Sequence, residues 1–364
     1  MILATGFAVA ALHADDEPTI EDPARHADHL EALGRGHLRV GEFPAAVRRL
    51  ADALALRRQI DAQDREIATH LRLCLALQRA GRFDEAGSCY RELLGLARST
   101  DDRELEARVL NNLGGLDWNR GEPDSAFDHY HRALALRREQ DDTFGVAATL
   151  NNLGALHRGL GELDTALLHY EDAHHAFETL GDTRWQARVL NNIGIAYLTL
   201  GDLDRALAYL LRALPLRRSV GDRSGEAVTL RGLGRTYLRL GEPAKASAFY
   251  RKALEVATAL DDRRGITNSQ RLLGEAHLAL GEPQAARAAL DPALAALRAT
   301  GQKKDYADVL VLSSRAHLAL GRHDEANRLA TEARQLYQLS RHPLGEVDAL
   351  AALADLDARR GDHE

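Results

Sequence analysis

The stretch LNNLGALHRGLGELDTALLHY, which runs from Leu150 to Tyr170, carries the pattern that decides the fold. Its leucines at 150, 153, 156 and 160 follow the spacing of one helix face. Gly161 interrupts the pattern, and Ala166, Tyr170 and Ala173 then follow helical spacing in a second segment. Glycine can take the left-handed conformation that ends a helix. The stretch therefore predicts two helices joined by a turn at Gly161.

The same pattern recurs every forty residues along the sequence. Glycines hold the register at Gly41, Gly81, Gly121, Gly161, Gly201, Gly241, Gly281, Gly321 and Gly361. An alanine stands five residues after each of the first eight, and a tyrosine or leucine usually follows four residues later. A second break falls near Asp101, Asp141, Gly181, Gly221 and Asp261. Since one helix pair cannot bury its faces alone, the pairs are expected to stack into an all-α solenoid.

The register gives eight helix pairs and one leftover helix, roughly 345–360. Small residues such as Gly154 and Ala166 are expected to let paired helices approach closely, with Tyr170 filling the space beside them. Two parts are predicted: an N-terminal apolar and acidic segment, 1–22, and a solenoid domain, 23–364. The final turn stops in mid-motif, which leaves a fragment of a larger protein as an open alternative.

The register resembles the tetratricopeptide repeat (TPR) family over about residues 24–360. One copy carries the family's signature residues Leu233, Gly234, Tyr237, Gly241, Ala246, Tyr250 and Ala253. The unit is roughly six residues longer than usual, as in kinesin light chains, Pins-type adaptors and bacterial peptide-sensing regulators. The resemblance implies a right-handed TPR superhelix. Local departures are Ser313-Ser314 in place of Leu-Gly, and Asp117, His157, His277 and His317 in place of an aromatic.

The composition argues against several classes of function. The 364 residues carry a net charge of −7, which argues against nucleic-acid binding, because that needs clustered positive charge. The apolar run 2–12 is shorter than the roughly 20 residues of a membrane span, so no membrane partner is expected. That run leaves a clipped export signal as the alternative to a cytoplasmic protein. Cys74 and Cys89 are expected to be buried, reduced thiols, with a redox pair as the alternative.

Three central repeats carry a pair of adjacent asparagines, within LNNLG or LNNIG. They are Asn111, Asn112, Asn151, Asn152, Asn191 and Asn192. At 100° per residue, the pair at 151–152 falls opposite the core stripe, and Asn152 shares a line with the small residues Ala148, Ala155 and Gly159. The resemblance implies that the first helix of each pair lines a concave surface. The carboxamides, which both donate and accept hydrogen bonds, are therefore candidate peptide ligands. A second interpretation is that they bridge neighbouring first helices.

Four arginines extend this candidate site. Arg108 and Arg188 lie one turn before Asn112 and Asn192, and Arg235 and Arg239 lie on the corresponding line of the next repeat. Guanidinium groups bind carboxylates bidentately. The sequence therefore predicts a locally basic groove that favours an acidic or C-terminal segment of a protein or peptide.

No catalytic motif, nucleotide-binding loop or Cys/His spacing of a metal site stands out. We therefore expect no enzyme activity, no cofactor and no metal. The predicted function is a protein–protein interaction module that binds a partner segment in the concave groove. The alternative is the sensory or regulatory TPR array of a larger signalling or transcription-regulatory protein. The sequence specifies neither the partner nor the oligomeric state.

Overall fold

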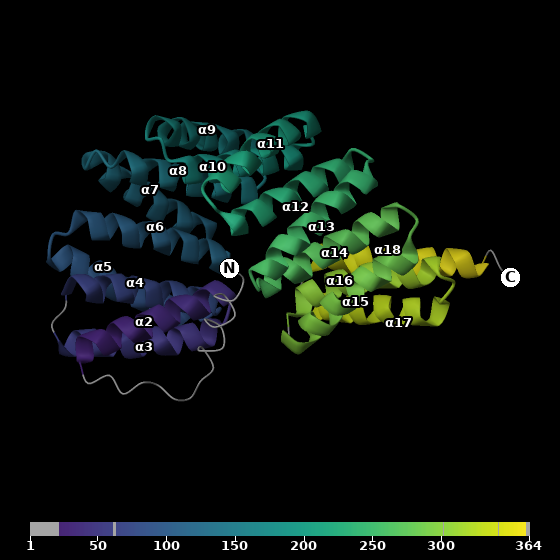
Figure 1. Ribbon diagram of the computed structural model, residues 1–364, viewed down its shortest axis with the longest axis horizontal. Coiled ribbons are helices and arrows are strands. Elements are labelled where there is room, and N and C mark those ends of the chain that lie inside the picture. The colour runs from purple at the N-terminus through teal and green to yellow at the C-terminus, as the bar shows by residue number, and fades with distance from the viewer. Residues whose placement is uncertain (1–21, 61–62, 301, 341, 362–364) are drawn as a thin grey trace, which may run out of the picture. The chain divides into compact units, whose positions relative to one another are not determined.

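The computed structural model describes residues 22–60, 63–300, 302–340 and 342–361, and the regular elements in these ranges are all α-helices (Figure 1). The helices that come first in each pair are α2 (Pro23–Val40), α4 (Gln63–Arg79), α6 (Arg103–Arg120), α8 (Thr143–Gly159), α10 (Thr183–Leu200), α12 (Arg223–Arg239), α14 (Arg263–Ala279) and α16 (Lys303–Ala319). Their partners are α3 (Phe43–Gln59), α5 (Phe83–Ser99), α7 (Pro123–Glu139), α9 (Leu163–Thr179), α11 (Leu203–Ser219), α13 (Pro243–Ala259), α15 (Pro283–Thr300) and α17 (His323–Leu339). The last helix is α18 (Pro343–Gly361).

These helices confirm the prediction of eight pairs and a terminal helix. The protein divides into two compact units, Met1–Asp182 and Thr183–Glu364. Four pairs, α2 to α9, form the first unit, and four pairs with α18 form the second. Within each unit, every helix packs against the next one in sequence, and several first helices also contact the next first helix. The N-terminal segment predicted for residues 1–22 lies outside the described residues except for Asp22.

The turns follow the predicted chemistry. The glycines that end the first helices have positive φ angles, for example 83° at Gly41 and at Gly161. At the second break Asp101 has a φ of 52°, and the Asp102 side chain accepts a hydrogen bond from the Leu105 amide at 2.9 Å. Because Asp tolerates the left-handed region and also caps helices, an Asp-Asp pair can close one helix and start the next.

Close helix approach explains the glycine that six of the eight first helices carry at the position of Gly154. A Cβ added at Gly154 would stand 2.8 Å from the Tyr170 ring and 3.1 Å from the Ala166 carbonyl oxygen. Tyr170 and Ala166 are fully buried. The predicted packing of Gly154, Ala166 and Tyr170 is therefore confirmed, and the ring fills the space that the glycine leaves.

Two of the three histidines that replace aromatic residues have carboxylate partners. The Nδ1 atoms of His157 and His277 lie 2.6 and 2.7 Å from carboxylate oxygens of Glu162 and Glu282, five residues later. The Asp117 carboxylate lies 2.6 Å from His129 Nδ1 on the paired helix. His157 also stacks on His169 at 5.1 Å between ring centroids, at the positions where Tyr197 stacks on Tyr209 at 5.5 Å.

The prediction of two reduced thiols was wrong. Cys74 on α4 and Cys89 on α5 form a disulfide, and their Cα atoms are 5.5 Å apart. The reason is the hairpin: Cys74 stands seven residues before Gly81 and Cys89 eight residues after it. The turn at Gly81 therefore brings the two side chains together between antiparallel helices. In the described ranges, no helix is long and apolar enough to cross a membrane.

The buried tyrosines make stability depend on alkaline pH. Burial raises the pKa of Tyr130 to about 12 and also raises the pKa values of Tyr90 and Tyr250. An exposed phenol titrates near 10, so these groups contribute stability that is complete below about pH 10 and is lost as the pH rises through about 12. We expect alkaline unfolding to coincide with phenolate formation in ultraviolet absorbance. Ionisation of Tyr90, Tyr130 and Tyr250 near pH 10 with the helices intact would contradict this.

Candidate functional site

The candidate binding face follows one line of positions along the first helices. On α6 this line consists of Arg108, Asn112, Gly115 and Asn119, which share a face because they are four, seven and eleven residues apart. We call the equivalent positions of the eight first helices, α2 to α16, the asparagine line. Its first four helices belong to the first unit and its last four to the second.

The first asparagine is buried in two of the three pairs. Asn151 and Asn191 are only 2% and 5% exposed. Asn191 accepts a hydrogen bond from the buried Thr229 hydroxyl of α12 at 3.0 Å. The helical projection placed both asparagines opposite the core, but it ignored a second packing surface. First helices also pack against one another, and in the second unit that contact covers Asn191, whereas Asn111 of the first pair is half-exposed.

The second asparagine is half-exposed in all three repeats, at Asn112, Asn152 and Asn192. Asn152 Nδ2 donates to Asn111 Oδ1, 3.0 Å away on α6. This bond confirms the bridging interpretation for that pair of helices. The same contact exists between the first two repeats, where Arg72 of α4 donates to Glu31 of α2 at 2.6 Å.

The four predicted arginines are all exposed, with different surroundings. Arg108 lies 3.8 Å from the Glu104 carboxylate, with half of its side chain in solvent. The Arg188 guanidinium stacks 4.6 Å above the Trp185 ring. Arg239 donates a hydrogen bond to the Leu198 carbonyl near the end of α10, so it caps the C-terminal end of that helix. Arg235 lies one turn before Arg239 on the same line.

The space beside Asn152 is partly used by the protein itself. A Cβ at Gly159 would come within 2.3 Å of the Trp118 ring, which belongs to the neighbouring first helix α6. The prediction that small residues leave room for a ligand is therefore wrong at Gly159, because the Trp118 side chain of the preceding repeat occupies that space.

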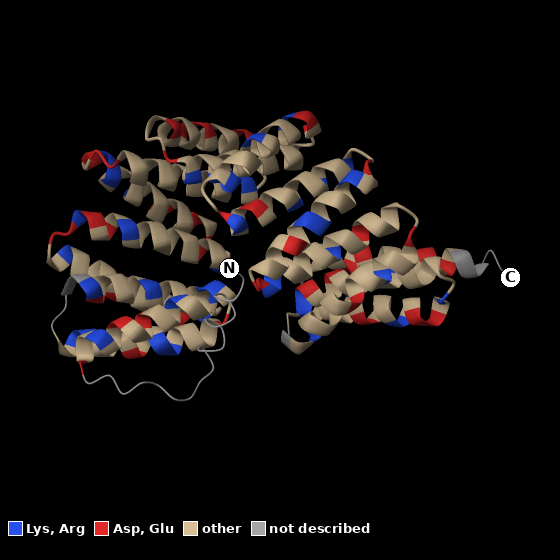
Figure 2. Cartoon of the chain, viewed as in Figure 1, with Lys and Arg blue, Asp and Glu red and all other residues tan. Residues whose placement is uncertain are grey.

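The asparagine line is basic although the protein as a whole is acidic. It carries eight exposed arginines against three acids, Asp28, Glu275 and Asp308, over the eight first helices. Four of these arginines belong to each unit: Arg35, Arg39, Arg79 and Arg108 to the first, and Arg188, Arg235, Arg239 and Arg315 to the second. Basic segments on α4, α6 and α12 can be followed in Figure 2.

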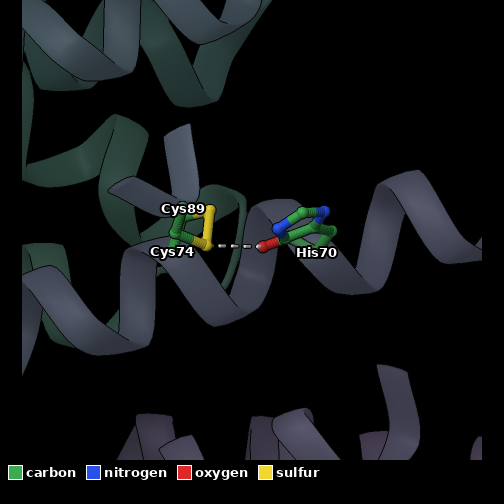
Figure 3. Close-up of side chains that lie close together, drawn as sticks. All are labelled: His70, Cys74 and Cys89. Carbon is green, nitrogen blue, oxygen red and sulfur yellow. Dashed lines mark hydrogen bonds between the residues drawn. A yellow bond between two sulfur atoms is a disulfide. The ribbon is translucent and has the colours of Figure 1, made fainter. Parts of the chain in front are cut away.

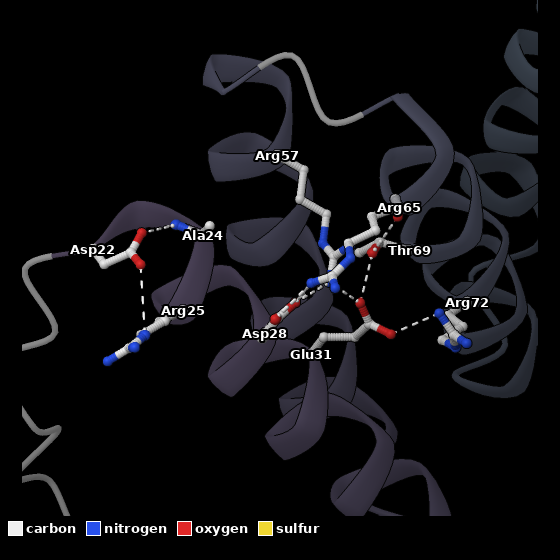
Figure 4. Close-up of polar contacts among 9 residues, drawn as sticks. All are labelled: Asp22, Ala24, Arg25, Asp28, Glu31, Arg57, Arg65, Thr69 and Arg72. Atoms are coloured by element: carbon white, nitrogen blue, oxygen red, sulfur yellow. Dashed lines mark hydrogen bonds and ion pairs between the residues drawn. The ribbon is translucent and has the colours of Figure 1, made fainter.

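A buried ionic cluster joins the first three helices, at the N-terminal end of the asparagine line. Glu31 of α2 is 7% exposed and accepts bonds from Arg57 at 2.5 Å, Thr69 at 2.8 Å and Arg72 at 2.6 Å (Figure 4). Arg57 on α3 is 4% exposed and also binds Asp28 at 2.9 Å. Three successive helices are thus joined through one carboxylate.

A second cluster, which the sequence reasoning missed, lies in the second pair. His70, Cys74 and Cys89 are all buried, and their potential ligand atoms lie within 4.8 Å of one another (Figure 3). Burial lowers the pKa of His70, and its Nε2 lies 3.6 Å from a Glu92 oxygen. The signal was present in the register, because His70 and Cys74 are one helical turn apart and replace the leucine and glycine of the pentad.

Comparison with known families supplies the identity of the repeats. The model described as "Tetratricopeptide repeat" matches residues 65–139, 107–179, 145–219 and 185–259, and a second model of that description matches 268–292 and 309–331. The chain belongs to the tetratricopeptide repeat family. This confirms the resemblance and the predicted all-α TPR superhelix class. No curated protein matches the sequence.

Solved structures share the fold at low sequence identity. A signal transduction ATPase (STAND) with a TPR sensor, from Pyrococcus horikoshii, is 16% identical with a TM-score of 0.61; the match covers 91% of this chain and 49% of that protein. This TPR array thus spans about half of the STAND protein. A Rap protein complexed with competence and sporulation factor is 14% identical, with a TM-score of 0.58 and coverage of 90% and 99%. Aspartyl phosphate phosphatase F of Bacillus subtilis is 13% identical, with a TM-score of 0.55 and coverage of 94% and 96%.

Proposed function

We propose that this TPR array is a non-catalytic interaction module in which the asparagine line of one unit binds an acidic segment, or the C-terminus, of a partner protein. The observation that carries the proposal is the charge of this line, where eight exposed arginines outnumber three acids in a protein of net charge −7. Exposed guanidinium groups can pair with carboxylates in two parallel hydrogen bonds. A family of interaction repeats makes such a surface a natural place for a partner.

The arginines and asparagines have different parts in this proposal. Arg108, Arg188 and Arg235 supply the charge that attracts and holds carboxylates. Asn112, Asn152 and Asn192 contribute amide contacts to the backbone of the partner. Because Asn152 also bridges to Asn111, its substitution affects both binding and the contact between α6 and α8.

Arg235→Glu is expected to weaken binding of an acidic peptide about tenfold or more, because one charge-assisted contact contributes roughly 1.5–3 kcal/mol. The probe is a fluorescently labelled peptide of alternating Asp and Ala residues with a free C-terminal carboxylate, followed by fluorescence anisotropy at low and high salt. The matched control is Arg251→Glu, the same charge change on the exposed side of α13. Equal losses from both variants would show that only overall charge matters.

The asparagines are tested by combining Asn112→Ala, Asn152→Ala and Asn192→Ala in one variant, with Asn327→Ala, on the exposed side of the second helix α17, as the control. The proposal expects the triple variant to bind the same peptide more weakly at unchanged helix content. Unchanged binding together with lower stability would assign the asparagines to helix stacking alone.

The second candidate function is the sensory array of a larger regulatory protein. It is favoured by the TPR sensor of the STAND protein, of which this array spans about half. The reading frame that encodes this array distinguishes the two functions. A frame that continues into an ATPase or a nucleic-acid-binding domain supports the sensory array.

We place the array in the cytoplasm. The disulfide between Cys74 and Cys89 provides the test, because a reducing compartment keeps cysteines as thiols. Differential alkylation of thiols in intact cells measures how many molecules keep this bond, and a cytoplasmic location requires that the reduced form predominates. Complete oxidation in growing cells would instead support export.

A further inference from the structure

The second helix pair departs from the other pairs at two buried positions of its first helix. His70 stands where six other first helices carry a buried leucine, for example Leu110 and Leu150. Cys74 stands where six carry the glycine that faces the large residue of the second helix, for example Gly114. Burying a polar imidazole in place of leucine costs free energy unless it gains a partner. These replacements therefore call for an explanation beyond the fold.

From this geometry we propose that His70, Cys74 and Cys89 form a Zn²⁺ site when the two cysteines are reduced. Cysteine thiolates and imidazole are the ligands that Zn²⁺ prefers in proteins. All three side chains are at most 8% exposed, and their ligand atoms already lie within 4.8 Å of one another. Two thiolates on one tetrahedral zinc stand about 3.8 Å apart, given Zn–S bonds of about 2.3 Å, so small side-chain rotations suffice.

The helices present these ligands in a chelating arrangement. His70 and Cys74 are four residues apart on α4 and so share one face, and Cys89 faces them from α5. Figure 3 shows the His70 ring beside the two sulfur atoms. The Cα atoms of Cys74 and Cys89 are 5.5 Å apart, which allows both cysteines to reach one ion.

Glu92 is a positioning residue for the site. Its carboxylate lies 3.6 Å from His70 Nε2 and also accepts a bond from Arg58 at 2.7 Å. A carboxylate that accepts the free N–H of a ligating histidine fixes the ring and strengthens the ligand. Cys89 and Glu92 also border a surface depression of about 470 Å³ together with Asp84 and Glu85. This acidic opening provides an entry path for a cation and room for water as the fourth ligand.

The disulfide in the structure is the metal-free, oxidised state of the same residues. A dithiol reductant donates two electrons and two protons to the Cys74–Cys89 bond and becomes a cyclic disulfide itself. Zn²⁺ then displaces the two thiol protons. In the reverse direction, an added disulfide oxidant accepts two electrons from the thiolates, the Cys74–Cys89 bond forms again and the ion leaves. Zinc binding and oxidation thus exclude each other at one site.

The test uses the full-length protein, reduced under nitrogen with a phosphine and then freed of reductant. Zn²⁺ is titrated in competition with a chromophoric chelator, and Co²⁺ replaces it as a spectroscopic probe. The expected result is one ion per reduced molecule, thiolate-to-cobalt charge-transfer absorption, and no ion bound at this site by the oxidised protein. Adding an oxidised dithiol to the zinc-loaded protein is expected to release the ion.

The variants are chosen from the other repeats so that the fold is retained. His70→Leu and Cys74→Gly restore the residues of other pairs, and both are expected to abolish binding. Glu92→Gln is expected to weaken it about 10–100-fold. His157→Tyr is the control. It introduces in another helix pair the tyrosine found at the equivalent positions Tyr197 and Tyr237, and it is expected to bind zinc like the wild type.

Several results would overturn the zinc site. The reduced wild type could bind zinc no more tightly than His70→Leu, cobalt could lack thiolate charge transfer, or oxidation could leave the zinc bound. Loss of helical circular dichroism on reduction would also overturn it, because the ligands would then not be held together.

Discussion

Replacing Glu31 by alanine is expected to lower the free energy of unfolding of the first unit by about 3–5 kcal/mol, the cost of removing one partner from a buried ion pair. Glu31 and Arg57 are 7% and 4% exposed, and their side chains meet at 2.5 Å. The alanine would leave the Arg57 guanidinium buried with Asp28, which is itself half-exposed. It would also remove the acceptor of Thr69 and Arg72.

The measurement is hydrogen exchange under native conditions, because an array of repeats can open locally. Amides of α2 and α4 are expected to lose most protection, and those of α7 least. Glu85→Ala, which removes an exposed ion pair with Arg82, is the control and should leave protection unchanged. The variant Glu31→Leu with Arg57→Met is expected to recover most of the loss, because both charges then disappear. Equal protection in Glu31→Ala and the wild type would mean that Arg57 finds another partner.

The fold was predictable from the sequence because its determinants are local and repeated. A glycine such as Gly161 ends the first helix of a pair, a second break, often Asp-Asp or Gly-Asp, separates neighbouring pairs, and an alanine with a large residue marks the second helix. Each is a backbone or packing requirement that returns every forty residues. Agreement between turn chemistry and helical period therefore specified the helix pairs without any long-range information.

The candidate site was only partly predictable. A projection of one helix identifies the side away from its main core, which is why Asn152 was correctly separated from Leu150 and Leu153. It does not include the neighbouring first helix α6, where Asn111 accepts the bond of Asn152, and it did not predict that Asn151 is buried. Likewise, the room beside Gly159 belongs to Trp118. Contacts between repeats decide which polar residues stay open, and a single repeat does not contain them.

The cysteines show a different reason for a missed prediction. Counting two cysteines in a long sequence gave no sign of pairing, whereas their nearly equal distances from Gly81 place them opposite each other in a helical hairpin. Comparing each repeat with its neighbours also marks His70, since a buried leucine stands in its place in six of them. Exceptions within a strict register are thus more informative than residue counts.

Gly154→Ala tests whether that register depends on close helix approach. The added methyl group would stand 2.8 Å from the Tyr170 ring and 3.1 Å from the Ala166 carbonyl oxygen. Both neighbours are fully buried and have little room to move. We expect the free energy of unfolding to fall by about 1–3 kcal/mol, the usual cost of overpacking a core.

The matched control is Gly95→Ala in α5, also inside a helix of the first unit. Its added methyl group would meet no heavy atom of the described residues within 4 Å, so this variant is expected to gain about 0.5–1 kcal/mol from helix propensity. Urea denaturation followed by circular dichroism compares the two, and opposite signs are the expected result. If both glycines give the same gain, the Tyr170 ring moves aside at little cost, and the glycine of the pentad is not required by packing.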